Sequence, residues 1–204
     1  MDFNNAQLFF GSHSLLECCT IGNHEGVIAL LASDMVDINV SDENGFSPLI
    51  WAADRGYVDI VKTLMSHNKC QVNQADNHGY TALMWAADFG NAKVVKELLK
   101  HPDINVNYRD ADGQTALMWA ADKGHHKIVK MLLGCKNVKV NFQNNEGFTA
   151  LICAAEQGFT DIVCELTKHP AIDTTLTDIS GVSALRAAVK NGHVEIVKLL
   201  RSHK

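Results

Sequence analysis

The sequence repeats itself every 34 residues, and this period constrains the fold more than any other feature. The pattern Gly-x-Ser/Thr-Pro/Ala-Leu recurs in unbroken register, starting at Gly45, Gly79, Gly113, Gly147 and Gly181. A degenerate copy starts one period upstream, at Gly11. The chain therefore divides into six repeats of one continuous domain: 1–44 with an N-terminal leader, 45–78, 79–112, 113–146, 147–180 and the shortened 181–204. Repeats of this length build folds in which each unit packs on its neighbours.

Each repeat carries signals for a short first helix. Thr81 has a hydroxyl that can cap the free amides at a helix start. Ser47 and Pro48 form a stronger signal, because proline fits the first helical position. Leu83 and Ala87 lie four residues apart and share one face of the helix. A glycine then ends the helix in five of the repeats, at Gly56, Gly90, Gly124, Gly158 and Gly192.

A second helix follows with a different apolar pattern. In the third repeat its apolar residues are Val94, Val95, Leu98 and Leu99, and Pro102 prevents the helix from continuing. The rest of the repeat is a polar connector with a hairpin-like turn at Asp-x-x-Gly. Two such short helices cannot bury their own apolar faces and must stack on copies of themselves. The sequence therefore predicts an all-α solenoid of helix-turn-helix repeats with hairpin loops.

A period of 34 residues also fits a tetratricopeptide array, but these repeats lack the Trp-x-x-Leu-Gly-x-x-Tyr start and spend about half their length outside helices. The pattern instead resembles the ankyrin repeat over essentially residues 11–204. The shared elements are Asp-x-x-Gly-x-Thr-Ala-Leu, Ala-Ala, Gly-His, Ile-Val-x-x-Leu-Leu and Val-Asn. This resemblance implies an ankyrin solenoid whose first helices line a concave groove where partners bind.

Two departures from the ankyrin pattern matter. The period is one residue longer than the usual 33. Thr-Pro-Leu-His is replaced by Ser-Pro-Leu-Ile, Thr-Ala-Leu-Met or Ser-Ala-Leu-Arg, and the Thr-Ala-Leu-Met form resembles arrays from protists. Loss of the histidine removes a buried polar link between repeats. Stacking is therefore expected to depend on apolar packing by Ile50, Met84, Met118 and Ile152.

Composition and charge limit the classes of function. The net charge of -5 and the pI near 6.0 argue against a nucleic-acid partner. Residues 1–112 contain 7 Lys/Arg and 15 Asp/Glu, whereas residues 113–204 contain 11 and 8, so a partner of the first half is expected to be basic. No apolar run is long enough to cross a membrane, and the start lacks a secretory signal. The six cysteines show no CxxC spacing, which favours a reducing compartment, the cytoplasm or the nucleus, and we expect a monomer.

The sequence predicts neither an enzyme nor a cofactor or metal site. It has no phosphate-binding glycine loop, no His-Glu-x-x-His and no Gly-x-Ser-x-Gly. One ladder recurs at the expected end of each second helix: His67, His101, Cys135, His169 and His203. Stacked helices lie about 8–10 Å apart, too far for several such ligands to meet at one zinc ion. We expect these residues to interact with helix C-termini, and the cysteines to be structural or incidental.

A row of tryptophans is the leading candidate for binding. At 100° per residue Trp51 lies about 200° from Leu49, on the opposite side of the helix from the buried face. Trp85 and Trp119 occupy the same register, and acidic and variable residues flank the row: Asp54, Arg55, Asp88, Phe89, Asp122, Lys123 and Glu156. This chemistry suits a protein partner with basic or aromatic anchors. Equally, the indoles could pack between adjacent first helices and extend the core.

The hairpin tips are the second candidate contact set. They carry Phe46, Tyr80 and Phe148 directly after the turn glycines, together with His78, Asp112 and Gln114. Exposed aromatic residues at a turn suggest contact with a partner. The alternative function is a reader of a modified lysine or other cation, which needs indoles converging within about 6 Å of one point. A purely mechanical spacer is the third possibility.

The two ends of the array differ from the middle. The first repeat has Gly26 where Ile60 stands in the next one, and it is preceded by Phe3, Leu8, Phe9 and Phe10. We expect it to be an N-terminal cap, with the leader covering the edge of the stack. The last repeat ends in Lys198, Arg201 and Lys204, which suit a solvated C-terminal cap. Both caps are therefore predicted, as expected for a whole array.

Overall fold

The computed structural model describes residues 3–33 and 35–202, with the side chains of residues 11–33 and 35–202 except that of His13. Within these residues the regular structure is helical, joined by turns and by two isolated bridges, Ala75–Thr81 and Thr177–Ser183. This confirms the predicted all-α class. None of the described helices is long and apolar enough to cross a membrane.

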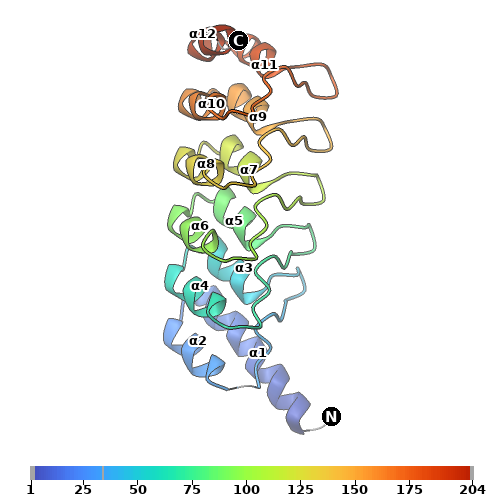
Figure 1. Cartoon of the computed structure of the whole chain (residues 1–204). Helices are drawn as coiled ribbons and strands as arrows, with labels where there is room; N and C mark the ends of the chain where they lie inside the picture. Colours follow the sequence, from blue (N-terminus) through green and yellow to red (C-terminus); the bar gives the residue numbers. More distant parts are fainter. Residues whose placement is uncertain (1–2, 34, 203–204) are drawn as a thin grey trace. The chain divides into compact units, whose positions relative to one another are not determined.

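The chain forms two compact units, Met1–Asn105 and Val106–Lys204. The first contains α1 (Phe3–Ile21), α2 (His24–Leu31), α3 (Pro48–Asp54), α4 (Val58–Met65), α5 (Ala82–Asp88) and α6 (Ala92–Leu98). The second contains α7 (Ala116–Asp122), α8 (His126–Leu133), α9 (Ala150–Gln157), α10 (Thr160–Thr167), α11 (Ala184–Lys190) and α12 (Val194–Ser202). Within each unit the odd-numbered first helices pack on one another in one layer and the even-numbered second helices in another, with the hairpins on one side (Figure 1).

The predicted starts and ends of the first helices are confirmed in repeats two to six. The Thr81 hydroxyl accepts the backbone N–H of Met84, and Ser47 caps α3 in the same way with Pro48 at its first position. Thr115, Thr149 and Ser183 cap the remaining first helices. The chain leaves α5 through Gly90 at φ +74°, a conformation that side chains other than glycine's rarely adopt.

The core lies between the two helix layers. Leu83, Ala86 and Ala87 on α5 are at most 1% exposed, and the small alanines allow the neighbouring helices to approach closely. On α6, Val94 and Leu98 are fully buried, whereas Leu99 at the helix end is half-buried. Four of the five residues at the position of the ankyrin histidine are buried, as predicted: Ile50, Met84, Met118 and Ile152. The fifth, Arg186 in the last repeat, is exposed.

Asparagines clamp each repeat to the next through the connector. The Asn73 side-chain amide donates from Nδ2 to the Asp103 carbonyl at 2.7 Å, and its Oδ1 accepts the Asn105 N–H at 2.8 Å. Three further asparagines make the same pair of bonds: Asn39, Asn107 and Asn141. The Val-Asn pair in the sequence is therefore an inter-repeat contact, in which the valine is buried and the asparagine spans two loops.

The first repeat departs from the others. Its first helix α1 has 19 residues, so the expected leader is a continuation of that helix. The side chains of Phe3, Leu8, Phe9 and Phe10 lie outside those described, and so does the predicted covering of the stack edge. Lys204 and His203 also lie outside the described residues.

Candidate protein-binding surface

Each hairpin is organised by one carboxylate or amide at its start. In the third repeat Asp76 is only 7% exposed, and its Oδ1 accepts the backbone N–H groups of His78 and Tyr80, both at 2.9 Å. Equivalent bonds are made by Asp42, Asp110, Asn144 and Asp178. These short local bonds fix the turn, which holds the hairpin tip in one conformation.

The second oxygen of this aspartate binds the tryptophan of the same repeat. Trp85 donates from Nε1 to Asp76 Oδ2 at 2.9 Å. Trp51–Asp42 and Trp119–Asp110 repeat this bond at 3.0 Å. The helical register places the tryptophans beside the acids of their own helix and does not reveal these turn aspartates. The sequence does contain a signal for this bond, because each turn aspartate lies nine residues before its tryptophan. In the fifth repeat both partners are replaced, by Asn144 and Cys153.

In the first unit the tryptophans belong to an aromatic cluster of Phe46, Trp51, Tyr80, Trp85 and Phe89. The Phe46 ring lies 4.8 Å from Trp51 and 5.1 Å from Trp85, so it fills the space between the indoles of two repeats. Tyr80 packs against Trp85 at 5.2 Å. Phe89 stacks on Trp85 at 5.8 Å and is itself 56% exposed.

This geometry answers the question left open by the sequence. The indoles are half-buried, with their N–H groups engaged and Phe46 between them, so they are largely part of the inter-repeat packing. Phe46 and Tyr80, expected as exposed aromatics, are half-buried because each packs on an indole. Phe89 is the member of the cluster whose ring is mainly open to solvent.

The acids on the first helices are also partly enclosed. The Asp54 side chain is only 13% exposed, and this burial raises the pKa of its carboxyl group. The positive charge of Arg55, 3.3 Å away, lowers the same pKa by a smaller amount. Arg55 also lies over the Trp51 ring at 5.6 Å. Asp88 is half-buried in the same register on α5.

The second unit has its own version of this surface. Lys123 lies over the Trp119 ring at 5.5 Å and pairs with Asp122 at 3.0 Å, and Gln157 also donates to Asp122. Phe148 and Gln114 at the turn positions are half-buried, and Gln114 accepts a hydrogen bond from Asn144. Glu156 is exposed, and its backbone carbonyl accepts a bond from Asn191 of the following repeat.

Comparison with known protein families assigns these repeats to a family. A family model described as ankyrin repeats (3 copies) matches residues 15–110, 68–144, 100–178 and 136–204. The chain belongs to the ankyrin repeat family. Ankyrin repeat proteins are generally protein-interaction modules, and the fold is typically non-enzymatic.

Two solved structures resemble the chain over nearly its whole length. The ankyrin repeat protein EF0377 has 29% identity, with 95% of this chain and 98% of that one covered and a TM-score of 0.88. A chain in the complex of the predatory endopeptidase Bd0816 from Bdellovibrio bacteriovorus with immunity protein Bd3460 has 32% identity, coverages of 94% and 98%, and a TM-score of 0.82.

Curated relatives share only a short segment. Acyl-CoA-binding domain-containing protein 6 from Danio rerio is 38% identical over 55 residues, which is 27% of this chain and 18% of that protein. The human protein of the same name is 35% identical over 54 residues, which is 26% of this chain and 19% of that protein. The match therefore spans less than a fifth of these relatives.

The tips of the ankyrin hairpins are held to one another within each unit. Asn77 donates its backbone N–H to the Asn44 carbonyl and its Nδ2 to the Glu43 carbonyl. Asn145 makes the same two bonds, to the carbonyls of Asp112 and Ala111. The His78 and Asp112 side chains at these tips are exposed. Exposed side chains therefore stand on a backbone that is bonded from repeat to repeat.

The histidine ladder has a local role that differs in detail from the prediction. In His67, His101 and His169, Nδ1 accepts the backbone N–H two residues further on, at 3.2–3.4 Å, so the rings bind turn amides rather than helix carbonyls. The Cys135 thiol instead contacts the Met131 carbonyl at 3.6 Å. No cluster of three or more candidate metal ligands occurs among the described residues.

All six cysteines are free thiols in the structure. Cys19 and Cys153 are buried among the first helices, and this burial raises the pKa of each to about 12. Burial likewise raises the pKa of Cys70 to about 11. A thiol with so high a pKa is a poor nucleophile at neutral pH, which agrees with a structural role.

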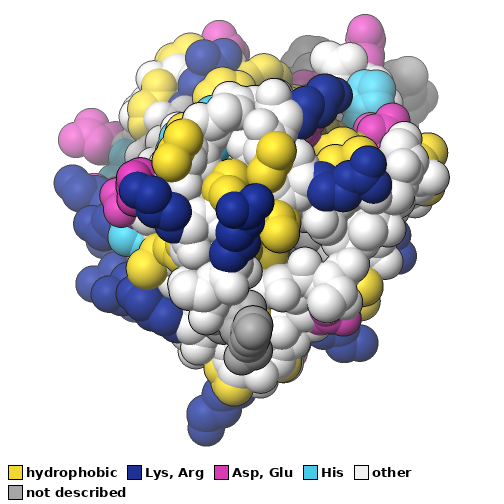
Figure 2. Space-filling model, turned by 90° about the horizontal axis from the view of Figure 1, so that it is seen from above, with side chains coloured by type: hydrophobic (Ala, Val, Ile, Leu, Met, Phe, Trp, Pro, Cys, Tyr) yellow, Lys and Arg dark blue, Asp and Glu magenta, His cyan; other side chains and the backbone are white. Residues whose placement is uncertain are grey.

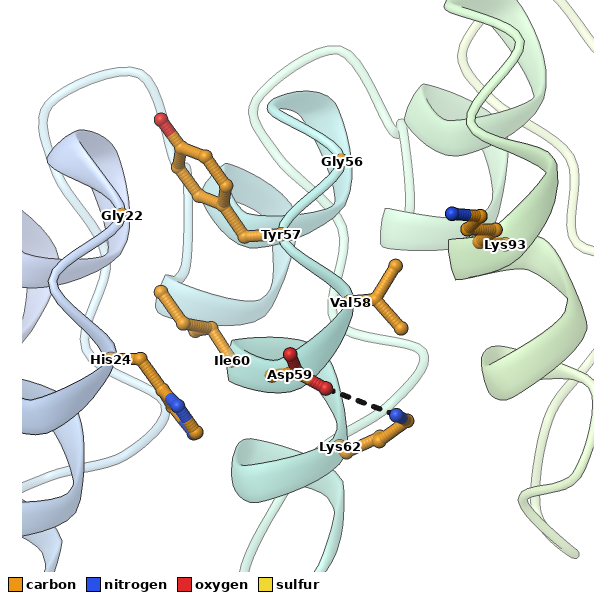
Figure 3. Close-up of a pocket in the computed structure, with 9 residues that line it drawn as sticks. All are labelled: Gly22, His24, Gly56, Tyr57, Val58, Asp59, Ile60, Lys62 and Lys93. Atoms are coloured by element: carbon orange, nitrogen blue, oxygen red, sulfur yellow. Dashed lines mark hydrogen bonds and ion pairs between the residues drawn. The ribbon is translucent and has the colours of Figure 1, made fainter.

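A shallow depression of about 570 Å³ lies on the second-helix side of the first unit (Figure 3). Tyr57 closes one end by packing over Gly22, and Asp59 and Lys62 form an ion pair of 3.0 Å at the other. A smaller depression occurs in the same register around Gly158 in the second unit. None of the predicted site residues lines either depression, and both result from the way successive second helices stack.

Proposed function

We propose that the chain is a non-enzymatic protein-interaction module whose partner binds along the first-helix side and the hairpin tips. Three observations support this proposal: the variation between repeats on this side, the exposed ring of Phe89, and the rigidity of the hairpins. We also propose the cytoplasm or nucleus as its compartment, on the cysteine pattern of the sequence.

Variation between repeats is concentrated at a few register positions. The stacking residues barely change, as the repeated Leu and Ala-Ala show. The position directly before each helix-ending glycine instead carries, in order, Arg55, Phe89, Lys123, Gln157 and Asn191. The position after each turn glycine carries Phe46, Tyr80, Gln114, Phe148 and Val182. Constant packing with variable side chains at one edge suits a surface adapted to a particular partner.

Phe89 provides the anchor point of this surface. An aromatic ring that is 56% exposed and stacked on Trp85 offers apolar area with little loss of side-chain entropy on binding. Asp54 and Asp88 lie in the same register on neighbouring first helices, which favours a partner segment with an apolar or aromatic anchor and basic neighbours. The Trp–Asp bonds hold the hairpins in place beforehand, which lowers the entropy cost of binding.

The cation-reader alternative has less support. A cage needs two open indole faces around one point. In the first unit Phe46 fills the space between Trp51 and Trp85, and Arg55 already lies over Trp51. In the second unit Lys123 lies over Trp119. A cationic ligand would have to displace the protein's own cations.

The proposal can be tested by affinity capture from a lysate of the source cells with quantitative mass spectrometry. Wild type is compared with Phe89→Ser and with the control Lys96→Glu, an exposed change on the second-helix side. Lys96→Glu should alter stability by no more than about 0.5 kcal/mol, whereas Phe89→Ser also loses the stack on Trp85 and should cost about 0.5–1.5 kcal/mol, so thermal melts establish that both variants are folded. The proposal predicts proteins that wild type and Lys96→Glu retain and Phe89→Ser loses. Equal retention by all three, or selective loss with Lys96→Glu, would exclude this surface.

A further inference from the structure

The hairpin stems of the second unit carry positive charge around one aromatic ring. The guanidinium carbon of Arg109 lies 5.6 Å from the centre of the Phe142 ring, and the Lys139 ammonium nitrogen lies 5.3 Å from it. Arg109 and Lys139 are exposed, and so is Lys136, three residues before Lys139 on the same connector. We call Arg109, Lys136, Lys139 and Phe142 the stem patch. Attraction to the ring holds two like charges close to each other.

No carboxylate neutralises the stem patch. Among the ion pairs of the described residues, none involves Arg109, Lys136 or Lys139. Asp173 has the register of Lys139 in the next repeat, but its carboxylate accepts hydrogen bonds from its own turn. Residues 123–145 contain five lysines and no Asp or Glu. The charge of the patch is therefore available to a partner.

Other exposed lysines of the second unit are already paired. Lys168 binds Glu165 at 3.2 Å on α10, and Lys198 binds Glu195 at 2.8 Å on α12. Figure 2 shows Lys and Arg side chains gathered on the second-helix side, with Asp and Glu side chains beside some of them. The stem patch differs from these pairs because its positive charge has no such counterpart.

The fold does not require the charge of the stem patch. Arg109 donates to the carbonyl of its own turn glycine at 3.1 Å and to the Gln143 carbonyl of the next repeat at 2.9 Å. In that repeat Gln143 makes the same two bonds, to its turn glycine and to the Thr177 carbonyl, both at 2.8 Å. The register of Lys139 is likewise filled by Gln71 in the second repeat. Neutral residues therefore suffice for stacking at both positions.

We propose that the stem patch binds an acidic segment, rich in Asp and Glu, of a protein partner. Carboxylates complement the exposed ammonium groups. The Arg109 guanidinium is partly engaged by backbone carbonyls, so the patch acts through compact lysine charges and not through a free arginine fork. The exposed acids Asp112 and Glu146 lie at the hairpin tips, which directs an acidic segment across the stems. This site is separate from the first-helix surface proposed above and does not depend on Phe89.

Fluorescence anisotropy tests this proposal with a fluorescein-labelled peptide of about ten glutamates, titrated with the purified full chain at about 50 mM salt to limit screening. The patch variant is Arg109→Gln/Lys139→Gln, which uses residues that the chain itself carries in these two registers. The control Lys168→Gln/Lys198→Gln removes the same charge from exposed positions that are paired within their own helices. Circular dichroism melting establishes that each variant is folded.

The proposal predicts that wild type and the control bind the peptide with similar affinity, and that the patch variant binds it at least about threefold more weakly. A wild type that does not bind the peptide would overturn the proposal. Equal weakening in both variants would also overturn it, because total charge and not the stem patch would then explain binding. Tighter binding of a poly-dT oligonucleotide or of phosphatidylserine vesicles than of the peptide would overturn the assignment to a protein segment.

Discussion

Because Asp76 and Trp85 are hydrogen-bonded, the loss of stability caused by Asp76→Asn should depend on whether residue 85 is a tryptophan. Asp76 uses one oxygen for the turn amides and the other for the Trp85 N–H at 2.9 Å. In Asp76→Asn the amide oxygen can still accept the turn amides. Its NH2 group then faces the indole N–H, and two donors oppose each other.

The magnitude follows from burial and charge. A hydrogen bond to a charged group contributes about 1.5–3 kcal/mol, and Asp76 is nearly buried, so Asp76→Asn should cost about 2 kcal/mol. Trp85→Phe removes the donor and some packing, but it also removes the donor–donor conflict. The double variant should therefore be more stable than the sum of the single effects predicts, by about 1–2 kcal/mol. Repeat five already combines Asn144 with Cys153.

The assay is urea unfolding of wild type, the two single variants and the double variant, followed by circular dichroism. Comparison of m-values detects partial unfolding of repeats, which would invalidate the two-state treatment. Asp112→Asn at an exposed hairpin tip controls for loss of one negative charge, and it should change stability by no more than about 0.5 kcal/mol. Additive single effects, within about 0.5 kcal/mol, would refute the reasoning that this bond fixes the hairpin.

Three further predictions follow from the packing. Gly124 and Gly192 both have positive φ, but a Cβ at Gly124 would lie 2.7 Å from the Phe159 ring, whereas nothing lies within 4 Å at Gly192. Gly192→Ala should therefore cost about 1 kcal/mol of stability and Gly124→Ala clearly more; equal costs in urea unfolding would contradict the close approach. Asn141→Ala removes both inter-repeat bonds and should cost about 1–3 kcal/mol, with the exposed Asn137→Ala as a near-neutral control in thermal melts. Burial raises the pKa of Asp54 above its usual 3.8, so the folded chain binds more protons than the unfolded chain above that pH, and stability from this group is lost as pH rises. The stability of Asp54→Asn relative to wild type should therefore increase as the pH rises above about 3.8; a relative loss would mean that the Arg55 ion pair dominates.

The fold was predictable because it depends on local, repeated signals. The caps at Thr81 and Ser47 and the helix-ending glycines act within a few residues, and a strict period transfers each assignment to the next repeat. The burial of Met84 and Ile152 followed from the same register. The helical continuation of the leader into α1 was not predictable, because no recognised cap or breaker marks where the leader ends.

The candidate site was only partly predictable. A helical wheel places Trp85 opposite the buried face of its own helix, but it contains no information about the hairpin that folds back over that helix. Asp76 reaches the indole through the turn, and Phe46 reaches it from the preceding repeat. Register identified the row of tryptophans and the exposed Phe89, whereas tertiary contacts decided which rings remain open.

Photo-crosslinking tests the central claim, that a partner binds along the first-helix side. A benzophenone amino acid is placed at position 89, next to Trp85, or at position 96 on α6, and the chain is irradiated in a lysate of the source cells. We expect a partner to be crosslinked from position 89 and not from position 96. Crosslinks from position 96 alone, or the same products from both positions, would contradict it.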